Sequence, residues 1–339
     1  IGVLQPNSIE EKYLEVLAKD ESVIVFTETT SNIHHTHFFP SIDQLISSLT
    51  PEELQYLQPE ILVTLGGMIV SKRIKVFFRN YSPKEHWHIG CKEANDTFFA
   101  LTEHIKCSPN HFFEFFLPLT KVVQTNYQTH WLSIKNDKLQ KHAVFEKQAP
   151  FSDFVVYKEI FNTIPKMSML QLANSTAIRY AQLFKLEASL QVFCNRGTSG
   201  IDGSTSTAIG AAVKSNNPTV FVTGDLSFFY DSNALWNLYI PNTFRIILVN
   251  NGGGGIFRIL PHAKEVDHFE NYFETRHALT ALHLCKMFGF EYATANSLDS
   301  VKSQLEDFYA PSENPKLLEI FTPSEVNDVV LKNYFKAIS

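Results

Sequence analysis

The two stretches that decide the fold are TVFVTGD, Thr219–Asp225, and FRIILVNNGGGG, Phe244–Gly255. Each begins with a run of apolar and β-branched residues and ends in polar residues, which is typical of a buried parallel strand and the loop that follows it. Between Asp225 and Asn250 lie 24 residues, enough for a crossover helix. Because parallel strands end at the same edge of a sheet, we expect the carboxylate of Asp225 to lie close to the carboxamide of Asn251.

The same alternation of β-branched runs and amphipathic stretches extends through residues 151–339. Connected by right-handed crossovers, such elements form a doubly wound parallel sheet with helices on both faces. Strands are expected at Ser168–Ala173, Leu190–Asn195, Thr219–Thr223, Phe244–Asn250 and Leu317–Phe321. Helices are expected at 175–186, 204–214, 232–239, 277–288 and 297–308.

The first 150 residues carry a weaker version of this pattern. Pro150 follows a long polar, amphipathic stretch and disfavours its continuation, so we expect a domain boundary there. The fold class predicted is α/β, with two doubly wound parallel-sheet domains at 1–150 and 151–339, which suits a length of 339 residues. In the first domain we expect strands at 23–27, 61–65 and 86–89, and helices at 9–18, 41–48, 97–105 and 126–147.

Composition narrows the class of protein. Hydrophobic residues make up 44% and charged residues 19%, which indicates a globular, soluble chain. The net charge of −6 argues against nucleic acid as a partner, and no apolar run approaches membrane-spanning length. Four scattered cysteines without a C-x-x-C pair indicate a reducing compartment, and we read no targeting segment from Ile1 onward. We therefore expect a cytoplasmic protein that is not bound to a membrane.

Candidate functional residues gather in the second domain. Nine of the 14 glycines lie between Gly197 and Gly255, and glycine serves where backbone takes unusual angles or approaches a ligand. Ser175, Arg196, Asp225 and Asn251 each follow a predicted strand. Carboxylate and amide oxygens suit Mg²⁺, and glycine backbone can reach an ion and a diphosphate. Each dipeptide alone is equally compatible with an ordinary turn.

Three blocks of sequence together resemble a known family. They are NRGTSGIDG (Asn195–Gly203), GDLSFFYD (Gly224–Asp231) and NNGGGGIF (Asn250–Phe257). The second and third resemble the diphosphate and Mg²⁺ motif of thiamine diphosphate enzymes, with Leu226 where many members have glycine. All three resemble the 2-succinyl-5-enolpyruvyl-6-hydroxy-3-cyclohexene-1-carboxylate synthase family of menaquinone biosynthesis. The resemblance covers the family's central and diphosphate-binding domains. We expect this chain alone to be inactive, because the glutamate that activates the cofactor belongs to the pyrimidine-binding domain.

The resemblance implies a transferase that uses thiamine diphosphate and Mg²⁺ (or Mn²⁺). Such an enzyme decarboxylates 2-oxoglutarate and adds the succinyl carbanion to isochorismate, in a homodimer or homotetramer. Two alternatives stay open. The chain could belong to another thiamine diphosphate-dependent 2-oxoacid decarboxylase or to an acetohydroxyacid synthase, or it could be a cofactor-binding fragment without catalytic activity.

Roles at the cofactor follow from the same resemblance. Asp225, Asn251 and the carbonyl of Gly253 are the implied metal ligands. Ile201 matches the apolar residue that supports the bent form of the cofactor. A helix is expected to begin just after Leu226 and Ser227, and its free amides favour a phosphate group, although Ser227 could serve only as a cap. The full set of implied cofactor contacts is Ser199, Gly200, Ile201, Gly224, Asp225, Leu226, Ser227, Asn251 and Gly253.

Substrate-binding residues are predicted around the same edge of the sheet. Ser175 and Arg179 lie one turn apart on a helix that follows a strand, and with Arg196 they offer donors for a dicarboxylic 2-oxoacid, unless Arg179 is simply solvated. Further candidates come from resemblance: Ile256 and Phe257 for the pocket, with core packing as the alternative, and Lys72 and Arg73 for the second substrate. We interpret His34, His35 and His37 as loop residues rather than metal ligands.

Overall fold

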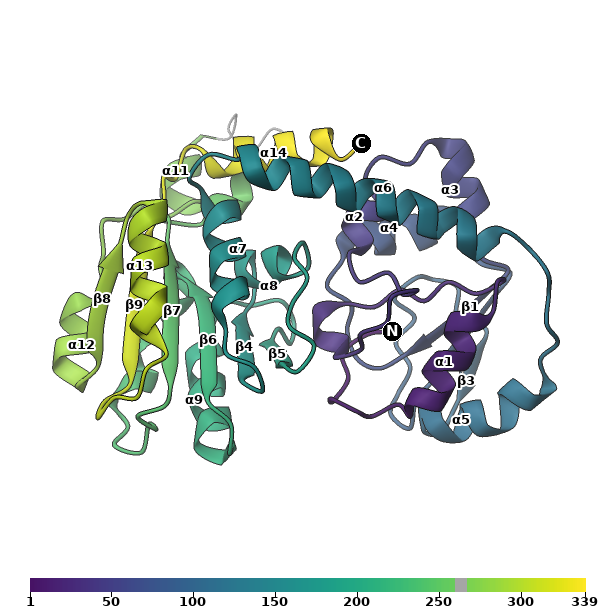
Figure 1. Ribbon diagram of the computed structural model, residues 1–339, viewed down its shortest axis with the longest axis horizontal. Helices are drawn as coiled ribbons and strands as arrows, with labels where there is room; N and C mark the ends of the chain where they lie inside the picture. The colour runs from purple at the N-terminus through teal and green to yellow at the C-terminus, as the bar shows by residue number, and fades with distance from the viewer. Residues whose placement is uncertain (260–266) are drawn as a thin grey trace. The chain divides into compact units, whose positions relative to one another are not determined.

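The computed structural model describes residues 1–259 and 267–339. The chain divides into two compact units. The first comprises Ile1–Phe145 with Phe335–Ser339, and the second comprises Glu146–Tyr334. Each contains a sheet whose described strands all pair in parallel, with helices packed on it (Figure 1). The predicted α/β class with two parallel sheets is confirmed.

The first unit is built on a three-stranded sheet in which β1 (Ile61–Leu65), β2 (Glu85–Ile89) and β3 (Glu103–Ile105) follow chain order. Successive side chains of β1 point to opposite faces, so Leu62 packs with one apolar core and Leu65 with another. The helices of this unit are α1 (Glu11–Lys19), η1 (Thr29–Ser31), α2 (Ile42–Ile46), α3 (Pro51–Leu57), α4 (Lys72–Asn80), α5 (Pro109–Phe116), η2 (Leu117–Leu119) and α6 (Tyr127–Gln148), the last of which continues into the second unit.

Two sequence predictions for this unit are wrong. Residues 23–27 form no strand, and Phe26 makes only an isolated bridge to Phe39. Residues 97–105 contain β3 instead of a helix. The carboxylate of Asp96 accepts hydrogen bonds from the amides of Ala100 and Leu101, which fixes a turn at the start of that segment and competes with helix formation. Helices α3, α4 and α5 were not predicted, although Ser108 and Pro109 are standard signals for a helix start.

The second unit contains a six-stranded sheet in the order β5-β4-β6-β7-β9-β8. The chain winds outward in both directions from the boundary between β4 and β6, and in open α/β sheets ligands bind at the carboxyl ends of strands beside such a reversal. All six residues of β7 are buried, as expected of a central parallel strand. The strands are β4 (Met169–Ala173), β5 (Gln191–Asn195), β6 (Thr219–Gly224), β7 (Arg245–Asn250), β8 (Glu291–Ala295) and β9 (Lys316–Phe321).

Helices cover both faces of this sheet (Figure 1). On one face α7 (Asp153–Thr163) packs against α8 (Thr176–Ala181) and α13 (Leu298–Phe308). On the other, α9 (Ser204–Lys214) and α12 (Leu282–Phe288) pack around the 3₁₀ turn η3 (Ser232–Trp236). The remaining described helices are α10 (Asp225–Tyr230), η4 (Gly255–Ile259), α11 (Phe269–Tyr272) and α14 (Asn327–Ala337).

The strands predicted for the second unit are confirmed, but β8 was missed. The α-helix predicted at 232–239 is wrong, because only residues 232–236 are helical and they form a 3₁₀ helix. Strand β8 lies at the sheet edge and is partly exposed, so it lacks the apolar run that marks a central strand. Helix α7 was also missed. Its residues Phe154–Tyr157 are all buried, so no 3.6-residue alternation of apolar and polar side chains marks it.

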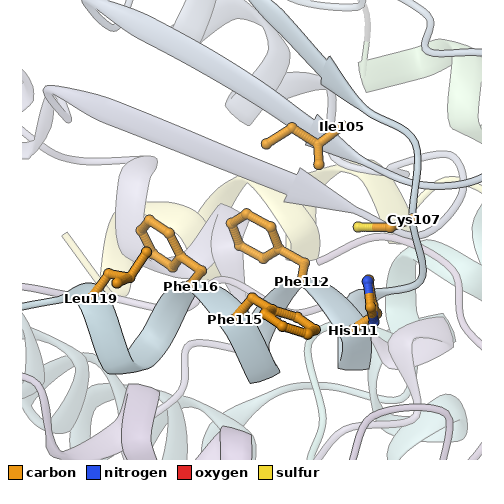
Figure 2. Close-up of a pocket in the computed structure, with 7 residues that line it drawn as sticks. All are labelled: Ile105, Cys107, His111, Phe112, Phe115, Phe116 and Leu119. Carbon is orange, nitrogen blue, oxygen red and sulfur yellow. The ribbon is translucent and has the colours of Figure 1, made fainter.

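An open, mostly apolar pocket of about 410 Å³ lies in the first unit (Figure 2). Aromatic side chains of α5 form one wall, and Ile105 and Cys107 lie opposite them. None of the residues predicted for the functional site lines this pocket. Among the described residues, no helix has both the length and the apolar character needed to cross a membrane.

Candidate functional site

The carboxyl ends of four neighbouring strands bring the predicted polar residues to one edge of the six-stranded sheet. Asn174 and Ser175 follow β4, Arg196 follows β5, Asp225 follows β6, and Asn251 follows β7. Strands β6 and β7 are direct neighbours. The side chains of Asp225 and Asn251 therefore come from adjacent strand ends.

Asp225 is the first residue of α10, and its side chain is buried. Its Oδ2 accepts the amide N–H of Gly253 at 2.9 Å, and its Oδ1 accepts that of Leu226 at 2.7 Å. Nε2 of His277 lies 3.4 Å from Oδ2. Nδ1 of His277 accepts the amide N–H of Leu279, so Nε2 is the ring nitrogen that faces Asp225. These groups fix the position of the carboxylate beside the glycine run.

The two polar atoms of the Asn251 side chain differ in whether they have a hydrogen-bond partner. Its Nδ2 donates to Oδ2 of Asp153 at 2.9 Å. Its Oδ1 is buried and has no hydrogen-bond partner among the described residues. A buried amide oxygen without a partner is costly, so such an atom calls for a ligand or a water molecule.

Asp153 was not predicted from the sequence. It is the first residue of α7 and only 1% exposed, and Thr322 Oγ1 donates to its Oδ1 at 2.6 Å. Burial raises the pKa of this carboxyl group to about 6, and the negative charge of Asp225 acts in the same direction. The neighbouring carboxyl groups of Asp153 and Asp225 form an environment that favours a cation.

The donor set at this edge fits a hard divalent cation. It offers the carboxylate of Asp225, the unpartnered Oδ1 of Asn251 and the backbone of Gly253, which is bonded to Asp225. Oxygen atoms of these kinds are the ligands that Mg²⁺ takes in proteins. No group of three or more His, Cys, Asp and Glu side chains in the described part of the chain has the geometry to hold a metal. His34, His35 and His37 lie between η1 and α2, outside the described helices and strands.

The glycine run has a structural reason besides ligand access. Gly253 has φ +148°, and a Cβ there would lie 2.6 Å from the carbonyl oxygen of Glu274. The amides of Gly254 and His277 donate to the carbonyls of Glu274 and Gly252, respectively. Residues 274–277 therefore pack directly against the run, and only glycine allows this approach.

Hydrogen bonds from two side chains hold the loop between β5 and α9. Nδ2 of Asn174 donates to the carbonyls of Ser199 and Gly200 at 2.7 and 2.8 Å, and Oγ of Ser227 donates to that of Ile201 at 2.6 Å. Asn174 follows β4 and Ser227 lies just after β6, so these bonds hold the loop at the reversal of strand order.

For Leu226 and Ser227 the sequence expectation needs correction. Both lie inside the first turn of α10, which begins one residue earlier than Leu226. The amide of Leu226 donates to Asp225 and the hydroxyl of Ser227 to Ile201. In this structure neither of these two donors is therefore available to a phosphate group.

Both predicted arginines bond to the end of β4. Nη1 of Arg179 donates to the carbonyl of Ser175 at 2.8 Å, and Nη1 of Arg196 donates to Oδ1 of Asn174 at 2.6 Å. Ser175 has φ +75°, an uncommon conformation for a residue other than glycine. Arg196 is 9% exposed, and its Nε has no hydrogen-bond partner among the described residues. Two guanidinium groups thus converge on consecutive residues at the strand end.

Comparison with known proteins bears on this arrangement. Residues 174–320 match the family model described as thiamine pyrophosphate enzyme, C-terminal TPP binding domain. Over 338 residues the chain is 53% identical to the 2-succinyl-5-enolpyruvyl-6-hydroxy-3-cyclohexene-1-carboxylate synthase of Flavobacterium johnsoniae, covering 100% of this chain and 61% of the relative. Synthases of the same name from Flavobacterium psychrophilum and Christiangramia forsetii are 51% and 54% identical, with 100% and 99% of this chain and 62% and 59% of the relatives covered.

Over essentially its whole length the chain is similar to synthases of this name. It spans about three fifths of the length of these relatives. The thiamine pyrophosphate domain match begins at Asn174 and includes Arg196, Asp225 and Asn251. The resemblance to the synthase family was inferred from three short blocks of sequence. The alignments with the relatives confirm it along essentially the whole chain.

Ile256 and Phe257 lie on η4, directly after the glycine run. Ile256 is half-buried, and Phe257 is 37% exposed, with its ring edge-on to that of Phe273. Neither side chain is fully buried. Both keep apolar surface that a ligand can contact.

Lys72 and Arg73 belong to the first unit, whereas all the other predicted site residues belong to the second. They are exposed at the start of α4, where Oγ of Ser71 accepts the amide of Ile74. The guanidinium of Arg73 lies 4.8 Å from the ring centre of Phe335. A role of this basic pair in substrate binding stays a prediction.

Sequence reasoning missed Asn174, Asp153 and His277. Asn174 directly precedes the predicted Ser175, so its position at a strand end was available as a signal. Asp153 and His277 lie 98 residues before and 26 residues after Asn251 and become its neighbours only through packing. No local motif marks either of them.

Proposed function

We propose that this chain is part of a synthase that decarboxylates 2-oxoglutarate and adds the resulting succinyl group to isochorismate. The observation that carries the proposal is sequence identity of 51–54% with three 2-succinyl-5-enolpyruvyl-6-hydroxy-3-cyclohexene-1-carboxylate synthases, across essentially the whole chain. The chain spans about three fifths of those relatives, so we propose the activity for an assembly that also contains the remaining part. Two units in this chain would correspond to the central and the diphosphate-binding domains, with boundaries near 1–150 and 151–339.

The cofactor site of the proposed enzyme is the edge of the six-stranded sheet. Thiamine diphosphate, when bound, supplies the electron sink that decarboxylation of a 2-oxoacid requires. Mg²⁺ or Mn²⁺ would be held by Asp225, Asn251 and the carbonyl of Gly253, an assignment supported by the unpartnered Oδ1 of Asn251. Ser199, Gly200, Ile201 and Gly224 would contact the cofactor. For Leu226 and Ser227 we keep a contact role but not amide or hydroxyl donation, since those groups bond within the protein.

Substrate recognition would rest on charge. Arg179 and Arg196 approach the same strand end, and charge-assisted hydrogen bonds from two guanidinium groups suit the distal carboxylate of 2-oxoglutarate. Ser175 would orient the donor substrate, and Ile256 and Phe257 would exclude water from the reacting carbon. Lys72 and Arg73 would bind the carboxylates of isochorismate. A homodimer or homotetramer in the cytoplasm is the assembly we propose, to be tested by analytical ultracentrifugation.

A substrate assay tests the proposed reaction. The chain is combined with the part of the Flavobacterium johnsoniae synthase that lies outside the alignment, and CO₂ release is measured with 2-oxoglutarate and with pyruvate. We expect turnover of 2-oxoglutarate in the combined sample and none with the chain alone. Arg179→Ala should reduce kcat/KM for 2-oxoglutarate about 10- to 100-fold, since a hydrogen bond to a charged group contributes about 1.5–3 kcal/mol.

The control for that assay is Lys185→Ala, which removes a cation from the same unit outside the predicted site. It should leave turnover unchanged. Preference for pyruvate over 2-oxoglutarate would contradict the proposal and favour another thiamine diphosphate-dependent decarboxylase. Turnover by the chain alone would contradict the requirement for the remaining part.

A further inference from the structure

The amide group of Asn251 can be placed in two ways, and only one of them presents oxygen to a cation. An asparagine side chain has one acceptor atom and one donor group, and rotation by 180° exchanges them. In this structure Nδ2 points to Asp153 and Oδ1 is buried without a partner among the described residues. Something in the protein must therefore select this orientation.

Asp153 provides that selection because an ionised carboxylate only accepts hydrogen bonds. Rotation of the Asn251 amide would bring its oxygen against Oδ2 of Asp153, which is repulsive. Asp153 is itself fixed: Thr322 donates to Oδ1, and the backbone amide of Asp153 donates to Oδ1 of Asn327 at 2.8 Å. Thr322 follows β9, the neighbour of β7, so the two strand ends and α7 meet at this carboxylate.

A purely structural role accounts poorly for these contacts. An acidic residue that serves its own helix bonds amides of the first turn. The bonds to the Asp153 carboxylate come instead from side chains at the ends of β7 and β9. Burying a carboxylate is unfavourable, and the hydrogen bonds to that of Asp153 come from two neutral side chains, Asn251 and Thr322.

We propose that Asp153 is a positioning residue that orients the Asn251 amide so that Oδ1 faces the divalent cation. This inference rests on the proposed function, since it concerns the metal site of that enzyme. The mechanism parallels the way outer carboxylates orient metal-binding side chains in general, where loss of the outer group weakens metal affinity about 10- to 100-fold.

The test is a pair of complementary substitutions in the full chain. Asp153→Asn introduces an amide that can donate to Asn251 Oδ1, which turns the ligand oxygen away from the site. Mn²⁺ affinity, measured by electron paramagnetic resonance with saturating thiamine diphosphate, should fall at least 10-fold. The swap Asp153→Asn with Asn251→Asp conserves net charge and leaves one carboxylate oxygen facing the site. It should recover affinity to within about 3-fold of the wild type.

Two further measurements separate orientation from folding. Thermal unfolding of the apo chain should show that Asp153→Asn folds as stably as the wild type or more so. Thr322→Val removes the hydrogen bond from Thr322 to Asp153 but keeps the one between Asp153 and Asn251. It should therefore lower Mn²⁺ affinity less than Asp153→Asn does. If Asp153→Asn does not fold, comparison of Asn251→Asp with the swap decides, and tighter binding by the swap is expected.

The outcomes are distinguishable. Equal Mn²⁺ affinity of the wild type and Asp153→Asn overturns the positioning role and leaves the proposed function intact. Failure of a folded swap to bind more tightly than either single variant also overturns it. No Mn²⁺ binding by the wild type with thiamine diphosphate present overturns the proposed metal site, and the positioning role with it.

Discussion

At the scale of single residues, the site depends on backbone groups as much as on side chains. The amide of Gly253 holds Asp225, and the carbonyl of Ile201 accepts the hydroxyl of Ser227. Gly253 reaches its position because it adopts φ +148° and lies against Glu274. Any side chain at Gly253 would both strain the backbone and push residue 274 away.

Gly253→Ala should therefore destabilise the protein by about 2–4 kcal/mol, through backbone strain and overpacking together. Urea unfolding monitored by circular dichroism measures this change. The matched control is Gly210→Ala in the interior of α9, where a Cβ meets no atom within 4 Å and φ is helical. That substitution should stabilise the protein by about 0.5–1 kcal/mol. Equal effects of the two substitutions would contradict the assigned strain.

At the scale of elements, strand β2 shows how a parallel strand separates its two faces. Trp87 and Ile89 pack with the apolar core under α5. His86 and His88 lie on the opposite face, where Nε2 of His86 and Nδ1 of His88 lie 2.9 and 3.1 Å from Oγ1 of Thr64. Burial lowers the pKa of both histidines, and the nearby His104 lowers that of His88 further.

Acid should therefore destabilise the first unit. A group whose pKa is lower in the folded state contributes stability that is fully present above the unfolded pKa of about 6.5 and is lost as pH falls through the folded pKa. Between pH 7 and pH 5, the free energy of unfolding should fall by up to about 1.4 kcal/mol per pH unit for each histidine. The double variant His86→Gln, His88→Gln should show a smaller slope in that range and the wild-type slope above about pH 7.5. Identical slopes at acid pH would show that these histidines are not linked to folding.

At the scale of the whole molecule, the chain passes between its two units twice. Helix α6 begins in the first unit and ends in the second, and α14 begins in the second and ends at residues assigned to the first. The returning segment is anchored there, because Lys138 Nζ donates to the carbonyl of Ile338 at 2.6 Å and Arg73 lies over the ring of Phe335. The last five residues thus belong to the first unit, although the sheet of that unit, β1 to β3, lies more than 200 residues earlier in the sequence.

Ile338→Ala should destabilise the first unit by about 2–5 kcal/mol, because Ile338 is fully buried there. Hydrogen exchange followed by mass spectrometry should show faster exchange in β1 and β2 than in the wild type. Exchange in β6 and β7 should change less. Ile246→Ala, at an equally buried position in β7, should give the reverse pattern. Faster exchange confined to β6 and β7 in Ile338→Ala would contradict the assignment of the last residues.

The sequence predicts those features that local patterns specify. Apolar runs such as Arg245–Asn250 mark central strands, because a parallel strand buried on both faces must be apolar along its length. Polar residues directly after such runs mark the carboxyl edge, so Asp225 and Asn251 were found as a pair. Edge strand β8 was missed because it is partly exposed and has no continuous apolar run. Helix α7 was missed because all residues of its first turn are buried, so polar and apolar side chains do not alternate there. The turn at Asp96 likewise depends on a side chain bonding to backbone that periodicity does not report.

By itself the sequence determined the α/β class, the resemblance to the synthase family and the strand ends that carry the predicted site, because each depends on residues close together in the chain. Only the tertiary structure decided which way the amide of Asn251 faces and what holds the carboxylate of Asp225. Asp153 contacts Asn251 and His277 contacts Asp225 from distant parts of the chain, and Thr322 holds Asp153. These contacts depend on the distances and directions between buried polar groups. Such distances and directions are set only when the chain folds and its elements pack together.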